Sequence, residues 1–341
     1  MKTSVSIQYL RAIAAVGVAA YHACQWRSGG FEVGRAGVDL FFVISGFIMW
    51  RITAGRETAL ASFVWRRFTR VAPTYWVLTL AMAGVALAWP NFLPNVHAGW
   101  RHVLLSMAFI THLDPKGLPF PVLPAGWTLN YEAVFYLLFA AGLWLREQSR
   151  ILFVTAALTA VAVLGLLDPP LYALGANAMM LEFAAGLWLG RLAQRGLLPG
   201  PKVGMLLAAG GVIAFAASNT AGVADSLLRP LLWGLPAAAL VLGALALEAA
   251  GRTPRLPWLK RLGDASYSIY LGHAPATAVV AHTLGTDRPW LFIPAALAAS
   301  ILAGLAGRAL LEKPLLRLLR GAAGAGELRP VPGWQAAPGT D

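Results

Sequence analysis

Long apolar stretches recur along almost the whole chain and leave only short polar segments between them. A membrane-crossing helix needs about 20 mostly apolar residues, and ten stretches approach that length. They lie near residues 7–26, 36–52, 73–89, 127–145, 151–167, 173–190, 203–219, 230–248, 266–284 and 290–311. Only 12% of the residues are charged, whereas soluble domains carry about 25%. The sequence therefore predicts an all-α, polytopic membrane helix bundle with about ten transmembrane helices, solvated by the lipid bilayer.

The positions of the basic residues predict which loops face the cytoplasm, because Lys and Arg are enriched on that side. Segment 51–72 carries five arginines, and further basic clusters follow the fourth, sixth, eighth and tenth stretches. This pattern places both termini in the cytoplasm. It also accounts for the net charge of +12 without a nucleic-acid partner. A shorter apolar stretch lies near 101–112. If it crossed the membrane, the later basic loops would no longer all face the cytoplasm. We therefore expect 91–126 to be external, with an interfacial or re-entrant helix near 101–112.

We expect no further folded domain in the rest of the sequence. Residues 321–341 are rich in Gly, Ala and Pro and lack periodicity, which is typical of a disordered tail. We expect a transmembrane domain over 1–320 and a disordered cytoplasmic tail over 321–341. The single cysteine, Cys24, excludes an intrachain disulfide. Walker and HExxH motifs are missing, so we expect no metal site and no nucleotide hydrolysis.

Ionisable residues inside the apolar stretches are the candidates for function, because a charge in mid-membrane costs about 2.5–3.5 kcal/mol. Arg11 and His22 share the first stretch, and eleven helical steps of about 100° bring them to nearly one face, about 16 Å apart along the axis. Such a stripe suits a pathway through the membrane. A snorkelling arginine and a hydrogen-bonded core histidine would give the same pattern. Glu182 has no evident partner, and we assign it no role.

Two acidic residues begin apolar stretches that lie next to the outer half of the first one. Asp39 starts the second stretch and Glu132 the fourth, so the predicted topology places both at the depth of His22. A carboxylate beside an imidazole can fix its tautomer and raise its pKa, as a general base requires. In an alternative interpretation, the two acids pair with Arg11 or Arg35 and only hold helices together.

Arg67 and Arg70 stand three residues apart where the third stretch begins, on the predicted cytoplasmic side. At helical spacing they can present two guanidinium groups to one phosphate. Ordinary anchoring of the helix at the cytoplasmic surface is the alternative.

The motifs that contain these residues resemble the acyltransferase-3 family of multi-span membrane acyltransferases, and they occur in the family's order. They are the Arg11–His22 pair, GVDLFFVISGF, the Arg67–Arg70 pair before a proline, PAGWTLNYEAVFYL, LGDASYSIYLGHAP and Glu312-Lys-Pro. Thr128 stands where the family commonly has serine. Many larger relatives add a C-terminal hydrolase-like domain that is missing here, which leaves open whether the chain completes transfer alone or hands the acyl group to a partner.

The resemblance implies an enzyme that moves an acyl group, usually acetyl, from cytoplasmic acyl-CoA to a hydroxyl of an extracytoplasmic or lipid-linked glycan, such as exopolysaccharide or lipopolysaccharide. It implies a multi-pass protein of the bacterial cytoplasmic (inner) membrane. Acyl-CoA is then a co-substrate and no cofactor is permanently bound, while polysaccharide-assembly proteins are candidate partners. The family's essential first-span pair corresponds to Arg11 and His22, and its Arg-x-x-Arg motif corresponds to Arg67 and Arg70.

We expect Arg67 and Arg70 to hold the CoA phosphates and His22 to act as general base or transient acyl carrier. Asp39 or Glu132 would orient His22 and stabilise its imidazolium. Arg11 would line the CoA path or stabilise developing negative charge.

The family's Ser-Tyr-Ser-Ile-Tyr-Leu-x-His motif adds a second polar set in this chain. Tyr267, Tyr270 and His273 recur at intervals of three, which puts them on one helix face. They are expected to line the CoA entrance on the inner side, or only to pack between helices.

A transporter or flippase for a glycan precursor is the alternative function. It would also have buried charges and about ten spans, but it would favour two related halves with Gly- or Pro-broken helices. The sequence has no convincing halves of this kind.

Overall fold

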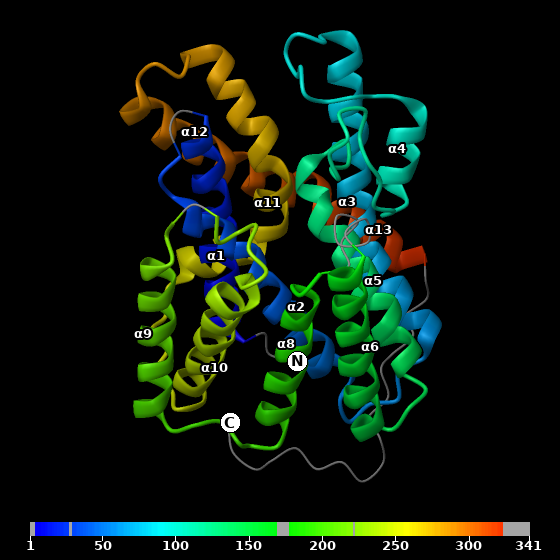
Figure 1. Cartoon of the computed structure of the whole chain (residues 1–341), viewed down its shortest axis with the longest axis vertical. Coiled ribbons are helices and arrows are strands. Elements are labelled where there is room, and N and C mark those ends of the chain that lie inside the picture. Colours follow the sequence, from blue (N-terminus) through cyan, green and yellow to red (C-terminus); the bar gives the residue numbers. More distant parts are fainter. Residues whose placement is uncertain (1–3, 27–28, 169–176, 221, 323–341) are drawn as a thin grey trace.

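The computed structural model describes residues 4–26, 29–168, 177–220 and 222–322, and these residues form helices and loops with no β-strand among them. Ten of the described helices correspond to the ten predicted apolar stretches (Figure 1). These are α1 (Val5–Gln25), α2 (Gly37–Thr53), α3 (Leu60–Ala88), α5 (Trp127–Gly142), α6 (Glu147–Leu167), α8 (Met180–Gln194), α9 (Pro201–Ala217), α10 (Leu235–Ala249), α11 (Pro257–Leu284) and α12 (Pro289–Gly307). The all-helical prediction is confirmed.

Five helical segments are long and apolar enough to cross a membrane, judged by length and composition. They are Glu32–Thr53, Leu60–Ala88, Glu147–Leu167, Pro230–Ala249 and Pro289–Leu319. Many large apolar side chains, including Leu137, Leu206 and Leu310, are exposed on the outside of the bundle. Lipid accommodates such side chains whereas water does not, so the fold is that of a multi-pass membrane protein.

The short stretch near 101–112 contains the eight-residue helix α4 (Trp100–Met107). Eight residues extend about 12 Å, well short of a hydrocarbon core of about 30 Å. The helix lies beside α3, where the Trp76 indole donates a hydrogen bond to the Met107 carbonyl at 2.7 Å. Its length agrees with a segment that does not cross.

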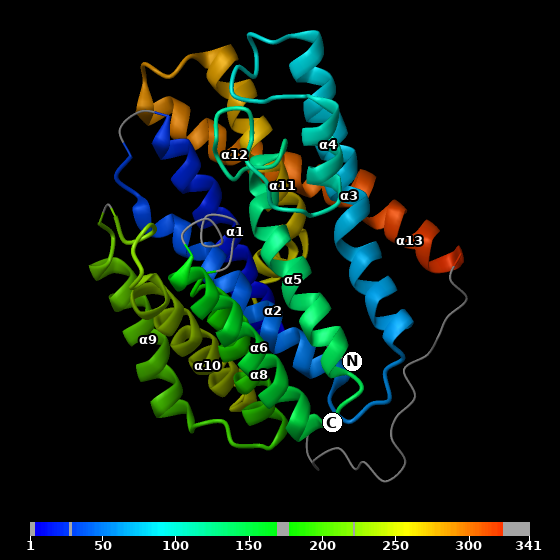
Figure 2. The ribbon, with the colours of Figure 1, turned by 45° about the vertical axis from the view of Figure 1, so that its right-hand side comes forward.

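The last described helix, α13 (Lys313–Ala322), continues from α12 through a π-helical turn, Arg308–Glu312, and lies against α3 (Figure 2). The predicted domain boundary at residue 320 falls inside α13. The rest of the predicted tail, 323–341, lies outside the described residues.

Glycines bring α2 and α8 into backbone contact. A Cβ atom added to Gly46 would lie 2.0 Å from the Phe183 carbonyl oxygen, and one added to Gly186 would lie 2.0 Å from the Val43 carbonyl oxygen. Small residues at such contacts let membrane helices approach closely. The two helices therefore pack without an intervening side-chain layer.

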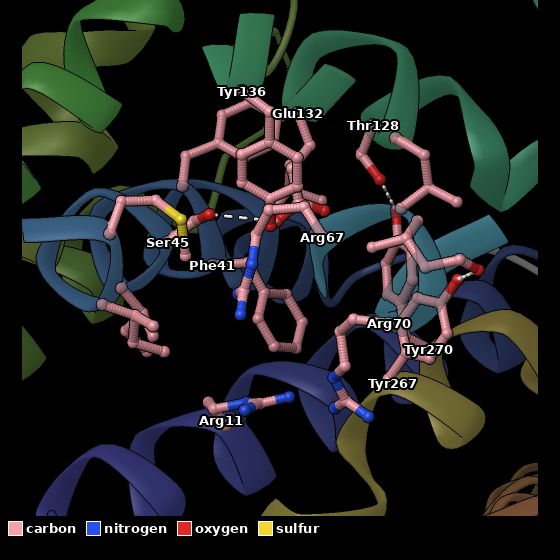
Figure 3. Close-up of a pocket in the computed structure, with 17 residues that line it drawn as sticks. Arg11, Phe41, Ser45, Arg67, Arg70, Thr128, Glu132, Tyr136, Tyr267 and Tyr270 are labelled. Carbon is pink, nitrogen blue, oxygen red and sulfur yellow. Dashed lines mark hydrogen bonds between the residues drawn. The ribbon is translucent and has the colours of Figure 1, made fainter. Parts of the chain in front are cut away.

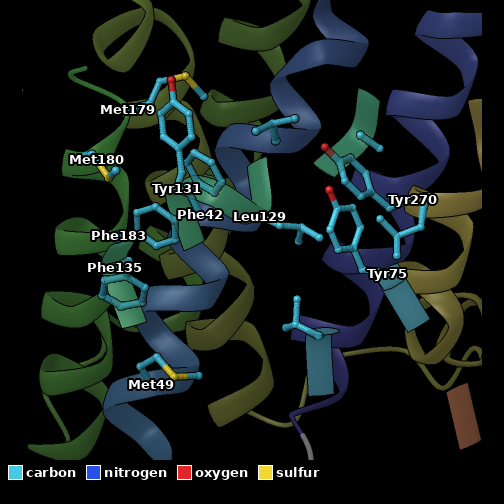
Figure 4. Packing of buried hydrophobic residues seen from close by; sticks show 14 of the residues in the cluster. Phe42, Met49, Tyr75, Leu129, Tyr131, Phe135, Met179, Met180, Phe183 and Tyr270 are labelled. Atoms are coloured by element: carbon cyan, nitrogen blue, oxygen red, sulfur yellow. The ribbon is translucent and has the colours of Figure 1, made fainter. Parts of the chain in front are cut away.

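A stack of aromatic rings joins this helix pair to α5 (Figure 4). The ring of Phe183 lies between Phe42 and Phe135, with centroid distances of 4.3 and 4.4 Å. All three rings are buried, and offset stacks of this kind contribute about 0.5–1.5 kcal/mol per pair beyond burial. Helices α2, α5 and α8 thus form one packed unit. Two of them, α2 and α5, also form walls of the site described next.

Candidate active site

A cavity of about 120 Å³ lies between α1, α2, α3, α5 and α11 (Figure 3), and we call it the inner cavity. Its polar lining residues are Arg11, Ser45, Arg67, Arg70, Thr128, Glu132, Tyr136, Tyr267 and Tyr270. The structure therefore brings Arg11 from the first helix together with the Arg67–Arg70 pair, Glu132 and Tyr270. Three guanidinium groups from two helices around one small space form a candidate binding site for an anion.

Arg70 is held in place by an acid from the far end of the chain. Its guanidinium forms an ion pair with Glu312, whose side chain is 1% exposed. The Ser268 hydroxyl donates a hydrogen bond to the other Glu312 oxygen at 2.6 Å. The Tyr267 ring lies beside the Arg70 guanidinium, and the distance from the ring centroid to Arg70 Cζ is 5.5 Å. Sequence reasoning recognised Glu312 only as part of a motif and missed its role in fixing Arg70.

Arg11 also has a hydrogen-bond partner on another helix. Its Nε donates to the Ser266 hydroxyl on α11 at 3.1 Å. This bond fixes the base of the guanidinium and leaves its terminal nitrogens facing the cavity (Figure 3).

Glu132 faces the inner cavity and not His22, which corrects the expected partner of this carboxylate. Its Oε1 accepts hydrogen bonds from the Ser45 hydroxyl, at 3.0 Å, and from the Tyr136 hydroxyl. Thr128, Glu132 and Tyr136 follow one another at intervals of four on α5 and therefore share one helix face. That face lines the inner cavity.

Asp39 also has a different partner from the one expected. Both of its carboxylate oxygens accept hydrogen bonds from Arg229, from Nε at 3.0 Å and from Nη2 at 2.8 Å. Both residues are almost fully buried. Asp39 thus ties α2 to the segment before α10 and does not orient His22. The sequence could not reveal this pair, because Arg229 falls in a connecting segment far from Asp39 along the chain.

Two further ionisable residues, Glu182 and Arg35, are not members of this pair. Glu182 on α8 is 2% exposed and lies within electrostatic reach of Asp39 and Arg229. Arg35, which we considered as a partner for the acids, pairs instead with Asp225 at 3.1 Å.

A second, larger cavity of about 960 Å³, here called the outer cavity, contains His22 and His273. It is lined by residues of α1, α2, α5 and α11, of the segments 95–125, 177–179 and 224–230, and by Trp26 and Arg35. The two imidazole rings stack with their centroids 4.8 Å apart and their planes at 27°. The partner of His22 is therefore a second histidine.

His273 does not lie with Arg67 and Arg70, which corrects its expected place at the inner entrance. The ninth helix begins at Pro257, nine residues before the predicted stretch, so His273 lies about 24 Å along its axis. His273 Nδ1 is 2.5 Å from the Tyr270 carbonyl oxygen. Because a carbonyl only accepts, Nδ1 carries the proton and Nε2 is free to act as an acceptor.

The family assignment follows from comparison with known proteins. A family model described as an acyltransferase domain matches residues 4–308. The chain belongs to the acyltransferase-3 family. The match confirms the resemblance seen in the motifs, and it includes Arg11, His22, Arg67, Arg70, Glu132 and His273. Glu312 lies four residues beyond the matched region.

Three relatives illustrate how far the similarity of this acyltransferase extends. The exopolysaccharide production protein ExoZ of Rhizobium meliloti (strain 1021) is 38% identical over 306 residues, which cover 87% of this chain and 94% of ExoZ. BcsY of Komagataeibacter xylinus, named as a membrane-bound transacylase, is 28% identical over 305 residues, or 82% of this chain and 74% of BcsY. The peptidoglycan O-acetyltransferase OatA of Listeria monocytogenes serovar 1/2a is 30% identical over 175 residues, 45% of this chain and 27% of OatA. No solved structure matches the chain.

The family and the fold together show that this acyltransferase is a membrane-embedded enzyme. The match to ExoZ covers most of both chains. The family model spans residues 4–308, so the helices that line both cavities belong to the family domain. The match to OatA covers only about a quarter of that longer protein.

Proposed function

We infer that this enzyme transfers an acyl group, specifically acetyl, from cytoplasmic acyl-CoA to a hydroxyl of an extracytoplasmic or lipid-linked glycan. The acceptor is a glycan such as exopolysaccharide or lipopolysaccharide. The observation that carries the proposal is the cluster of Arg11, Arg67 and Arg70 around one cavity, next to a cavity that contains paired imidazoles. The names of ExoZ and OatA support an acceptor of the polysaccharide class.

The proposed topology has ten crossings of a bacterial cytoplasmic membrane, with both termini inside. The domain consists of residues 1–320, and the tail 321–341 is cytoplasmic. The match of ten helices to ten apolar stretches supports the count, and the basic loops support the orientation. In this topology the inner cavity is near the cytoplasmic side, and the outer cavity opens to the opposite side.

The donor binds through its phosphates to Arg67 and Arg70. Hydrogen bonds between charged groups are shorter and about twice as strong as neutral ones, and Glu312 keeps Arg70 in position for them. The inner cavity, at about 120 Å³, is smaller than the roughly 300 Å³ of a typical small-molecule pocket. It therefore takes only one portion of the donor, its pantetheine end, while the phosphates remain at the cavity mouth. Arg11 and Tyr270 line the path of that arm.

His22 carries the chemistry on the outer side, where it is exposed to the cavity. As general base, its imidazole removes the proton of the acceptor hydroxyl, whose oxygen attacks the thioester carbon. The carbon–sulfur bond breaks, and CoA leaves as the thiol after taking up a proton. Alternatively, a ring nitrogen of His22 attacks the thioester carbon, the carbon–sulfur bond breaks, and CoA leaves as the thiol with the ring's proton. The acceptor hydroxyl oxygen then takes the acyl group from the ring nitrogen, and the hydroxyl proton returns to the imidazole. Glu132 has a different task in this scheme, since it balances the charge of the arginine cluster.

The outer cavity suits a carbohydrate acceptor in size and lining. Its volume lies near the upper end of the range of about 300–1,000 Å³ for ligand sites. Trp26, Trp127, Tyr21 and Tyr131 supply flat apolar faces, and Asn95 and Asn177 supply hydrogen-bonding groups. Sugar rings present both apolar faces and hydroxyl edges, so this mixture favours an oligosaccharide.

The proposal is tested with membranes that contain the full chain, labelled acetyl-CoA and the host's surface polysaccharide. We expect labelled O-acetyl esters on the polysaccharide, and mass spectrometry of cells without the chain should show the polymer without those esters. Loss of the polymer itself would contradict the proposal and favour the flippase.

A further inference from the structure

The inner and outer cavities meet at Val38 and Tyr270, the two residues that line both of them. Tyr270 on α11 also reaches across to α5, where its hydroxyl is 2.9 Å from the Thr128 hydroxyl (Figure 3). Both side chains are buried, at 6% and 5% exposed. A single hydrogen bond therefore connects the two helices at the boundary between the cavities.

The direction of this bond follows from a second contact. The Thr128 hydroxyl also lies 3.1 Å from the Ala125 carbonyl, which can only accept. Since the threonine has one hydroxyl proton, it donates to Ala125 and accepts from Tyr270. The edge-to-face contact with Phe41, at 5.7 Å between centroids, supports the ring of Tyr270 from α2. The Tyr270 carbonyl also fixes His273, so this residue contacts the outer histidine pair as well.

We propose that the Thr128–Tyr270 hydrogen bond is a gate between the donor cavity and the acceptor cavity. This inference rests on the proposed function. The donor phosphates are held by arginines of the inner cavity, whereas His22 lies in the outer cavity. The thioester must pass the residues that the cavities share in order to reach it. When closed, the gate keeps water in the outer cavity away from the thioester.

A neutral hydrogen bond is suited to this task because it is weak enough to open during each turnover. Its net contribution corresponds to about a fivefold change in an equilibrium constant. A passage that stayed open would allow a wasteful side reaction. Water would add to the thioester carbon, the carbon–sulfur bond would break, and a free carboxylic acid and CoA thiol would result.

The test measures release of CoA thiol from acetyl-CoA by the purified full chain in lipid nanodiscs, without any acceptor. Tyr270→Phe and Thr128→Val each remove the hydrogen bond and keep most of the side-chain volume. We expect each to raise acceptor-independent thiol release about fivefold. The double variant should release thiol no faster than either single variant, because all three lose the same bond.

Tyr9→Phe is the matched control. Its hydroxyl donates to the Pro254 carbonyl at 2.9 Å and accepts from the Leu256 N–H at 2.7 Å. Both bonds lie away from the two cavities, so thiol release should equal that of the wild type. The gate is wrong if both single variants release thiol at the wild-type rate, or if their effects add in the double variant. Should Tyr270→Phe fail to fold, Thr128→Val decides the question alone. A wild-type chain that never consumes acyl-CoA, with or without acceptor, would contradict the proposed function itself.

Discussion

Arg70 on α3 and Glu312 on the turn after α12 form an ion pair that joins distant parts of the chain at the edge of the inner cavity. Glu312 is buried, whereas the Arg70 side chain is 24% exposed and faces the cavity. The acid therefore acts as a fixed counter-charge that sets where the guanidinium points.

Glu312→Gln should weaken donor binding more than it slows the chemical step. Loss of a charged hydrogen bond is worth about tenfold or more, so we expect KM for acetyl-CoA to rise by at least about tenfold, with kcat changing less. The comparison is Glu57→Gln, an exposed acid that should leave both constants unchanged. A selective loss of kcat in Glu312→Gln would contradict a role in donor binding.

His22→Ala should reduce acyl transfer by about 10²–10⁴-fold, the usual contribution of a general base. The variant should still insert into the membrane and still bind acetyl-CoA, because the arginine cluster is intact. His282→Ala, a histidine at the far end of α11, is the control. Mass spectrometry of acid-quenched wild-type enzyme distinguishes the two chemistries, since an acylated His22 peptide requires the carrier mechanism.

His273→Gln tests the corrected position of this residue. Since His273 stacks on His22 in the outer cavity, its loss should lower kcat by about two- to tenfold, the range for one aromatic contact. KM for acetyl-CoA should stay at the wild-type value. A raised KM for acetyl-CoA with normal kcat would contradict this position and indicate that His273 acts in donor binding.

Asp39→Asn should destabilise the fold, because it leaves the Arg229 charge buried without its partner. Breaking a buried pair from one side costs about 3–5 kcal/mol, which thermal unfolding in detergent would detect. Asp39→Leu combined with Arg229→Met removes both charges and should recover part of the loss. If Asp39→Asn unfolds at the wild-type temperature, the pair does not stabilise the bundle.

Segment 91–126, which the proposed topology places outside the membrane, should loosen in acid. The His112 Nδ1 donates to the Ile110 carbonyl, so its Nε2 accepts from His102 Nδ1 at 2.6 Å. Burial, followed by the neighbouring His112, lowers the pKa of His102. A lowered histidine pKa adds stability above the unfolded value of about 6.5, and this stability is lost as the pH falls below it. Proteolysis of 91–126 should therefore accelerate between pH 7.5 and 5.5, and His102→Gln should abolish this pH dependence.

The sequence predicts the helical architecture well because apolar length and loop charge are local properties. Each of the ten predicted apolar stretches corresponds to a helix, and the short stretch near 101–112 corresponds to a helix of only eight residues. The position of His273 was wrong for a local reason too. Lys260, Arg261 and Asp264 lie in the first turns of α11, and their charges hid the true start of the helix at Pro257.

The partners of the acids could not be predicted, because they depend on which helix faces pack together. Asp39 meets Arg229 from a connecting segment, and Glu132 meets a serine and a tyrosine. Arg67 and Arg70 are predicted to act together because their spacing places them on one helix face, and both line the inner cavity. The meeting of Arg11 with this pair depends on how the helices pack, which spacing within one helix does not specify. Their roles in catalysis remain predictions.

The glycine contact between α2 and α8 has a mechanical consequence. Because the backbones touch at Gly46 and Gly186, α2 cannot slide along α8 without driving a side chain into the partner's main chain. The α2 wall of the inner cavity, which carries Phe41 and Ser45, is therefore rigid relative to α8. Any widening of this cavity has to come from movement of the helices that face α2.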